Sequence, residues 1–345
     1  MPRALRYFLF FFLGIGLGFI YLLMTQTPLE RVNLGNNALW IEKAIVPAQH
    51  DSTSKMRILF GGDLMFDRNV RILAEQIGYD NLVTSELKQL FFDHDLVIAN
   101  LEGPITDNNS LSVGTGPGDL HNTRFTFDPV VTQWLADHNF QLVNLGNNHL
   151  LDFGVEGVET TYQYLDQASV SYFGWIGPAP AVELFNKIST TLVLNDLNIG
   201  LVNYNQFGQQ TIESVLSEIS TLKDQVDYLI VFTHWGIEYA PEANAVITKQ
   251  GRQFIESGAH LVIGTHPHVI QPYEDYLHGR IYYSLGNFIF DQYFSTEVKR
   301  GQLVQLELEL IDQEATPSAS FREFEVLMEP NQAVQLSTES AEPNI

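Results

Sequence analysis

The sequence predicts an α/β fold in which two sheets pack face to face, and three observations support this. From Met56 onward, short apolar runs typical of strands alternate with segments of helical periodicity, which indicates parallel strands joined by helices. Beyond residue 268 the pattern changes to hairpins and alternating strands, which adds antiparallel strands. Five expected strands also lead directly into polar turns, where open α/β sheets place their sites. A two-sheet α/β sandwich accommodates all three.

The elements are expected in a regular order. Strands are expected at residues 58–60, 96–99, 140–144, 228–232 and 260–263. Helices are expected at residues 68–78, 81–92, 129–138, 155–168, 212–222 and 243–256. Hairpins are expected at 190–203 and 269–284, and further antiparallel strands at 303–310 and 321–328. Residues 107–121, rich in Gly, Asn and Ser, predict a loop beside the site.

The N-terminal segment predicts a membrane anchor. Tyr7–Met24 is an uncharged apolar run of 18 residues, preceded by Arg3 and Arg6. At about 1.5 Å per residue it spans about 27 Å, close to the ~30 Å hydrocarbon core of a bilayer. The arginines favour a cytoplasmic N-terminus and an extracytoplasmic remainder. A cleaved signal peptide is the alternative, but the run is longer than a usual signal core and no small-residue cleavage site follows Met24.

The whole chain is expected to divide into four parts. Residues 1–24 form the expected cytoplasmic stub and anchor, and residues 25–55 read as a polar linker. Residues 56–330 form the expected folded domain, and residues 331–345 an acidic, flexible tail.

Composition excludes several classes of function. The formal net charge of −23 and the pI near 4.6 argue against binding to nucleic acid, which requires clustered Lys and Arg. The chain has no cysteine, so disulfides, zinc–thiolate sites and cysteine nucleophiles are excluded. Any metal must therefore be held by nitrogen and oxygen ligands.

Side chains that can bind metal follow the expected strands. Some have a simpler interpretation: Asp63 could cap the next helix, Asn148 could stabilise a turn, and His266 could be an ordinary core histidine. Glu102 has none, because a Glu before Gly-Pro caps nothing obvious, and His234 ends a fully apolar strand. Together, two carboxylates, an amide and several imidazoles at successive strand ends indicate a site for Zn²⁺, Mn²⁺ or Fe²⁺. The candidate ligands are Asp63, Glu102, Asn148, His234, His266 and His268. Of the other histidines, His50, His94, His121, His138 and His278 are expected at solvated positions, and His260 as structural.

Six motifs resemble the CapA family, which is linked to poly-γ-glutamate capsule synthesis and related to the calcineurin-like metallophosphoesterases. They occur in order between Met56 and about Asp291. The motifs are Gly62-Asp63-Leu64-Met65 with Arg68, Asn100-Leu101-Glu102-Gly103-Pro104, Asn147-Asn148-His149 with Asp152 and Gly154, His234-Trp235-Gly236 with Glu238-Tyr239, Gly264-Thr265-His266-Pro267-His268, and Ser284-Leu285-Gly286-Asn287-Phe288. The resemblance implies the four-layer α/β/β/α sandwich of the metallophosphoesterases, preceded by one transmembrane helix.

The resemblance also implies roles for individual residues. Glu102 would bridge two divalent ions (Mn, Zn or Fe), one of them completed by Asn148, His234 and His266 and the other by Asp63 and His268. His149 would protonate the leaving atom and Asp152 would orient it, while Arg68 and Asn287 would bind substrate. One position departs from the phosphoesterase pattern: Met65 stands where a second first-strand ligand, a histidine, is usual. The site beside Asp63 is therefore expected to be weak, to hold a different metal, or to be empty.

Three functions follow from this resemblance. The first is a membrane-anchored metal-dependent hydrolase or transferase acting on poly-γ-glutamate or a related anionic polymer at the cell surface. The second is a phosphoesterase, which the missing histidine disfavours. The third is a non-catalytic accessory subunit of a polymer synthase and export complex in the membrane. Since the surface is acidic, Arg68, Arg124 or bound metal ions would have to neutralise a polyanionic substrate.

Overall fold

The computed structural model describes residues 55–174, 188–310 and 317–337. The predicted anchor and almost all of the predicted linker lie outside the described residues. Among the helices that are described, none has the length and apolar character needed to cross a bilayer.

The domain contains two mixed sheets. The first has the strand order β14-β13-β12-β1-β2-β3-β4, with β11 also paired to β1, and the second has the order β5-β6-β7-β8-β10-β9. The strands of the first sheet are β1 (Lys55–Leu64), β2 (Leu96–Leu101), β3 (Leu142–Asn144), β4 (Ser171–Phe173), β11 (Asn287–Ile289), β12 (Arg300–Glu309), β13 (Ser318–Leu327) and β14 (Gln335–Leu336). Those of the second are β5 (Ser189–Leu194), β6 (Leu197–Asn205), β7 (Tyr228–His234), β8 (Leu261–Thr265), β9 (Ile270–Tyr276) and β10 (Gly279–Leu285).

Each sheet combines parallel with antiparallel strands, as predicted. Strands β1 to β4 run parallel to one another, and so do β6, β7, β8 and β10. The antiparallel strands are β5, β9 and the β12–β13–β14 meander. Because the parallel strands end at the same edge, their terminal side chains gather there.

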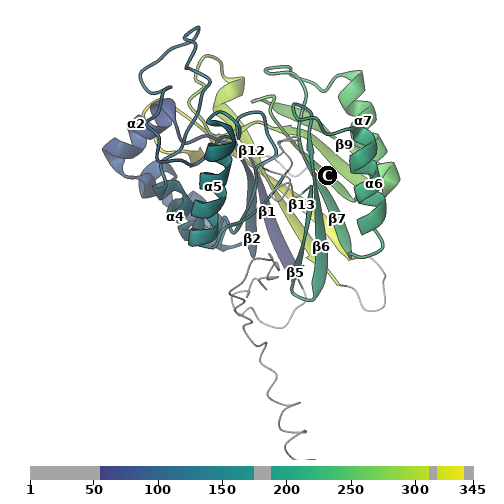
Figure 1. Cartoon of the computed structure of the whole chain (residues 1–345). Helices are drawn as coiled ribbons and strands as arrows, with labels where there is room; N and C mark the ends of the chain where they lie inside the picture. The colour runs from purple at the N-terminus through teal and green to yellow at the C-terminus, as the bar shows by residue number, and fades with distance from the viewer. Residues whose placement is uncertain (1–54, 175–187, 311–316, 338–345) are drawn as a thin grey trace, which may run out of the picture. The chain divides into compact units, whose positions relative to one another are not determined.

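The layers follow from three buried apolar clusters (Figure 1). One lies between the first sheet and the helices α2 (Arg68–Ile77), α3 (Ser85–Phe92), α4 (Val130–Asp137) and α5 (Gly154–Ala168). A second joins the inner faces of both sheets, and includes Phe60 of β1 and Phe232 of β7. The third packs α6 (Ile212–Leu222) and α7 (Ala245–Ser257) on the second sheet. The described domain is therefore an α/β/β/α arrangement, in agreement with the predicted fold class.

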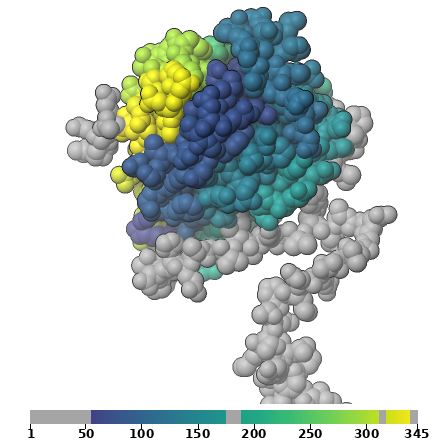
Figure 2. Space-filling view, turned by 90° about the vertical axis from the view of Figure 1, so that its left-hand side faces the viewer, coloured from purple at the N-terminus to yellow at the C-terminus, as the bar shows by residue number. Residues whose placement is uncertain are grey.

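The C-terminal part differs from the prediction of a flexible tail from residue 331. Strand β14 pairs with β13, and Val334 forms an isolated bridge with Val83. Val334 is buried beside Val83 and Leu82, so apolar packing holds this segment to the helical face. Figure 2 shows that face, with the yellow C-terminal segment beside the purple and blue early part of the described chain.

Candidate metal centre

The predicted ligands come from five strand ends and converge between the two sheets. Asp63 lies in β1, Glu102 follows β2, and Asn148 lies in the turn after β3. From the second sheet, His234 ends β7, while His266 and His268 follow β8. Potential ligand atoms of Glu102, His234 and His266 lie within 4.8 Å of one another, and so do those of Asp63, Glu102 and His268. Glu102 belongs to both groups.

Glu102 is surrounded by imidazoles but hydrogen-bonded to none. Its Oε1 lies 3.8 Å from Nε2 of His149, 3.8 Å from Nε2 of His234 and 3.9 Å from Nε2 of His268. These separations exceed a hydrogen bond, yet suit pairs of ligands that share an ion at about 2.0–2.2 Å from each. Both buried oxygens of Glu102 and the buried Nδ1 of His266 lack a hydrogen-bond partner within the described part of the chain. Such orphaned groups are costly without a ligand, so the donor set fits a divalent cation.

Burial disfavours the charged form of every ligand that it covers. It raises the pKa of Asp63 to about 6, and burial together with the nearby Asp63 carboxylate raises the pKa of Glu102 well above its usual range. Burial also lowers the pKa of His234, and lowers those of His266 and His268 to about 3. The imidazoles are therefore neutral, as metal ligands must be, and the paired carboxylates need a cation to be held ionised.

Hydrogen bonds fix the orientation of His234. The hydroxyl of Thr265 donates to the carbonyl of Thr233 at 2.8 Å and lies 3.0 Å from Nδ1 of His234, which Nδ2 of Asn100 also approaches at 3.2 Å. Nε2 of His234 faces Oδ1 of Asn148 at 2.8 Å. The ring is thereby held with Nε2 and the amide oxygen side by side, as a pair of potential metal ligands.

Asn287 orients His268 in the same way. Its Nδ2 donates to the carbonyl of Val298 at 2.9 Å and to Oε1 of Gln292 at 3.1 Å. Its Oδ1 therefore accepts from Nδ1–H of His268 at 2.9 Å, which leaves Nε2 facing Glu102. The polar atoms of Asn287 are thus engaged within the protein. This placement differs from the predicted substrate contact and makes Asn287 a support for a ligand.

His149 and Asp152 lie together at the centre's edge. Nδ1 of His149 is 2.9 Å from Oδ2 of Asp152, which also accepts the backbone N–H of Phe125 at 2.8 Å. The ring of Phe125 packs on His149 with centroids 4.4 Å apart. The imidazole is thereby held with Nε2 towards Glu102. Asp152 thus contacts His149, and proton transfer by this pair stays a prediction.

Arg68 is a nearly buried cation beside the centre. Its guanidinium lies 5.0 Å from the ring centre of Phe125 and 5.4 Å from that of Phe290, and it pairs with Asp291. Phe290 in turn packs against His268 with centroids 4.8 Å apart. Arg68 therefore adjoins the candidate ligands, and its role in substrate binding stays a prediction. The other arginine considered, Arg124, lies farther out, with its Nε donating to the carbonyl of Asp152 at 2.8 Å.

Asparagines beneath the ligands are functional residues that sequence reasoning left unassigned. Nδ2 of Asn100 donates to Oδ1 of Asp63 at 2.7 Å, and Asn100 accepts from Asn144 at 2.9 Å and from Asn147 at 3.2 Å. Asp63, Asn100 and Asn144 are register partners across β1, β2 and β3. Aligning the ends of the expected strands would have placed these three side by side.

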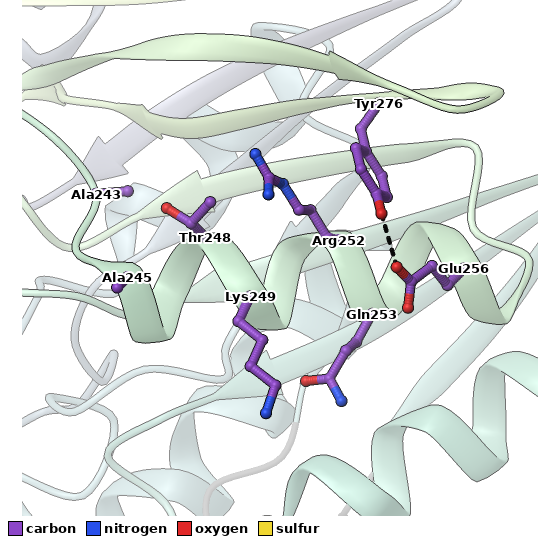
Figure 3. Close-up of a pocket in the computed structure, with 8 residues that line it drawn as sticks. All are labelled: Ala243, Ala245, Thr248, Lys249, Arg252, Gln253, Glu256 and Tyr276. Carbon is purple, nitrogen blue, oxygen red and sulfur yellow. Dashed lines mark hydrogen bonds between the residues drawn. The ribbon is translucent and has the colours of Figure 1, made fainter.

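A hollow of about 650 Å³ lies elsewhere, over α7 and beside β9 (Figure 3). Lys249, Arg252 and Glu256 of α7 and Tyr276 of β9 contribute to its lining, and the Tyr276 hydroxyl donates to Glu256 at 2.7 Å. None of the candidate ligands lines it. The convergence of ligand groups, and not this concavity, therefore locates the candidate site.

The chain is similar to curated capsule biosynthesis proteins and to a solved phosphatase structure. The chain is 27% identical over 293 residues to the capsule biosynthesis protein CapA of Bacillus anthracis, covering 79% of this chain and 69% of that one. It is 28% identical over 285 residues to the PGA biosynthesis protein CapA of Bacillus subtilis (strain 168), covering 78% and 72%. A crystal structure of a phosphatase from Mycoplasma pneumoniae aligns over 79% of this chain and 94% of that one, with 17% identity and a TM-score of 0.44.

A family model matches most of the folded domain. It is described as bacterial capsule synthesis protein PGA_cap and covers residues 57–292, a span that contains every candidate ligand named above. The chain is therefore a member of the bacterial capsule synthesis protein PGA_cap family.

Proposed function

We propose that this protein is a membrane-anchored, metal-dependent hydrolase or transferase that acts outside the cytoplasm on poly-γ-glutamate or a related anionic cell-surface polymer. Family membership and the names of the two CapA relatives support the biological setting. The observation that carries the catalytic part is Glu102, whose two buried oxygens lack partners while three imidazole nitrogens surround Oε1.

The ligand groups would hold one or two divalent ions of Mn, Zn or Fe. Asp63, Glu102 and His268 form one group; Glu102, His234 and His266 form the other, with Asn148 beside His234. When bound, such ions supply an activated water and polarise a carbonyl oxygen.

His149 would handle a proton in this reaction. Asp152 holds its Nδ1, so the ring stays fixed with Nε2 at the edge of the centre, where it can transfer a proton to the leaving amine. If an amine on the cell wall replaces water as the attacking group, the same arrangement serves a transferase.

Arg68 would bind a carboxylate of the polymer. A γ-linked glutamate chain carries one α-carboxylate per residue, and Arg68 is a cation held against Phe125 and Phe290 next to His268. Because its guanidinium already pairs with Asp291, a polymer carboxylate would share this cation with Asp291.

The anchor and the partners are part of the proposal. Residues 1–24 would fix the domain to the outer side of the cell membrane, with the N-terminus in the cytoplasm. Such an anchor would place the domain beside membrane subunits that make or export the polymer.

The test is metal analysis of the purified full-length chain in detergent, with Glu102→Ala as the paired variant. We expect about one or two equivalents of Mn, Fe or Zn in the wild type and their loss in the variant. The metal-loaded wild type should release free amines from poly-γ-glutamate, and Glu102→Ala should not. Release of nitrophenol from para-nitrophenyl phosphate without amine release would indicate a phosphoesterase instead. A wild type that stays metal-free and inactive after reconstitution would contradict the proposal and favour the accessory subunit.

A further inference from the structure

The loop after β7 brings an additional carboxylate to the centre. This loop, Trp235 to Tyr239, is held against the turn that carries His266 and His268, since the backbone N–H of Tyr239 donates to the carbonyl of Pro267 at 2.8 Å. Gly236 adopts a φ of 93° and its N–H donates to Oε1 of Gln206 at 2.8 Å. Both ends of the loop are therefore fixed, and Glu238 lies between them.

Glu238 forms a third group of potential ligands. One of its carboxylate oxygens and one ring nitrogen each of His266 and His268 lie within 4.8 Å of one another. Glu238 is exposed, whereas both histidines are buried. The carboxylate thus reaches the two imidazoles from the solvent side, opposite the buried Glu102 and Asp63.

The sulfur of Met65 does not add to the candidate ligands around Asp63. Sδ of Met65 is 3.0 Å from the backbone N–H of Asp67 and accepts from it, and the Met65 side chain is wholly buried. Within the described residues, the group around Asp63 therefore has three ligands: Asp63, Glu102 and His268. The other group has Asn148 in addition to Glu102, His234 and His266.

We propose that Glu238 is a further metal ligand, which binds from the solvent side to an ion that it shares with His266 and His268. This inference rests on the proposed metal-dependent function. Two lines support it: the clustering of Glu238 with His266 and His268, and the unpartnered buried Nδ1 of His266. A third carboxylate also favours hard ions such as Mn²⁺ over softer ones.

The experiment measures Mn²⁺ binding to the full-length chain by electron paramagnetic resonance of free Mn²⁺. Glu238→Gln removes the charge while keeping the size, and Glu242→Gln is the matched control because Glu242 is also exposed, lies in the same connection and belongs to none of the three ligand groups. We expect Glu238→Gln to bind one Mn²⁺ at least tenfold more weakly than the wild type, with the other ion unchanged, and Glu242→Gln to match the wild type.

Equal affinities of the wild type and Glu238→Gln, within twofold at both ions, would overturn the inference. That outcome leaves the proposed function intact, because the wild type would still hold its metal. A wild type that binds no Mn²⁺, Zn²⁺ or Fe²⁺ would instead contradict the metal-dependent function itself. Since Glu238 is exposed, the near-ultraviolet circular dichroism spectrum of Glu238→Gln should equal that of the wild type and so exclude misfolding as the cause.

Discussion

Thr265 helps to orient the ring of His234. Its hydroxyl donates to the carbonyl of Thr233 and lies 3.0 Å from Nδ1 of His234. Asn287 does the same for His268 through an amide fixed by Val298 and Gln292. Supports of this kind typically change metal affinity by about 10–100-fold when removed.

Replacing Thr265 should therefore weaken metal binding without removing a ligand. We expect Thr265→Val, which keeps the shape and loses the hydroxyl, to lower the affinity for one ion by about 10–100-fold, and Thr265→Ser to remain near the wild type. Competition with a fluorescent chelator measures this. Similar affinities for the two variants would show that the Thr265 hydroxyl does not orient His234.

Among individual residues, the sequence predicted the candidate metal ligands more readily than the residues that orient them. The six candidate ligands were identifiable because they carry metal-binding groups at the ends of expected strands. Thr265 also follows an expected strand, but a hydroxyl is no such signal and nothing local shows that it faces His234. Two histidines expected in solvent, His94 and His138, are instead buried. Each follows a helix, and its Nδ1 lies 2.6 or 2.8 Å from the carbonyl four residues earlier, at Leu90 and Trp134 respectively. This use of a helix's free carbonyls depends on packing that the sequence pattern does not show.

Strand β1 approaches the turn after β10 very closely. A Cβ built on Gly62 would lie 1.9 Å from the carbonyl oxygen of Gly286, and the neighbouring Asp63 N–H donates to that same oxygen at 3.1 Å. The glycine therefore sets the distance at which Asp63 meets Asn287, its register partner.

Gly62→Ala should consequently force β1 and this turn apart. Because the obstacle is backbone and cannot rotate away, we expect a loss of stability of about 2–3 kcal/mol or more, together with weaker metal binding. Gly116→Ala is the control: its Cβ would meet no atom within 4 Å, so a change within about 0.5 kcal/mol is expected. Urea unfolding measures both. An equal midpoint for the two variants would be incompatible with this close approach.

His260 lies just before β8 and forms hydrogen bonds with β7, and its protonation is coupled to folding. Its ring Nδ1 accepts the backbone N–H of Leu229 at 3.0 Å, and the backbone N–H of His260 donates to the carbonyl of Leu229 at 2.8 Å. Burial and the nearby His278 lower the pKa of His260 to about 4, below the value of about 6.5 in the unfolded chain. The unfolded state thus binds more protons between these values, so this contribution to stability is complete above pH 6.5 and is lost as the pH falls towards 4.

His260→Asn should flatten this part of the pH dependence. The asparagine oxygen can still accept from Leu229 but does not titrate. We expect the wild type to lose about 1–2 kcal/mol more than the variant between pH 7 and pH 5, measured by urea unfolding at each pH. Parallel losses in the two proteins would rule out His260 as the titrating group.

The bounds of helices and strands were predictable where the element is long enough to show a repeating apolar pattern. Helix α6 has its expected bounds, and α2 and α5 differ by one residue from theirs. Helix α3 begins at Ser85 and not at residue 81, because Tyr79–Leu82 forms a separate 3-10 turn. Strands β4, β11 and β14 were missed, since two or three residues are too few to show a period.

In the described domain as a whole, both sheets supply candidate metal ligands. Asp63 and Glu102 come from the first sheet, while His234, His266 and His268 come from the second. The sequence predicted two sheets and the edge at which these residues meet. It did not predict the strand orders, since pairings such as β1 with β12 join segments more than two hundred residues apart.

A bound ion should therefore stabilise the packing of the sheets. At a free ion concentration of about 100 Kd, we expect the free energy of unfolding to rise by about 2.7 kcal/mol, and chelation to abolish the gain. Glu102→Gln should show no gain, and in the metal-free state it should be at least as stable as the wild type, because it relieves the burial of two adjacent carboxyl groups. Thermal unfolding with and without Mn²⁺ measures this. A gain retained in Glu102→Gln would place the ion elsewhere.

The origin of the ligands in two sheets also constrains when the ion can enter. Asp63 and His268 lie at opposite ends of the family-matched region, so no early fragment of the nascent chain contains a complete ligand set. If these groups hold an ion, loading would follow assembly of the whole domain. The supply of metals in the compartment where the chain folds, and not the supply where it is synthesised, would then decide which ion is bound.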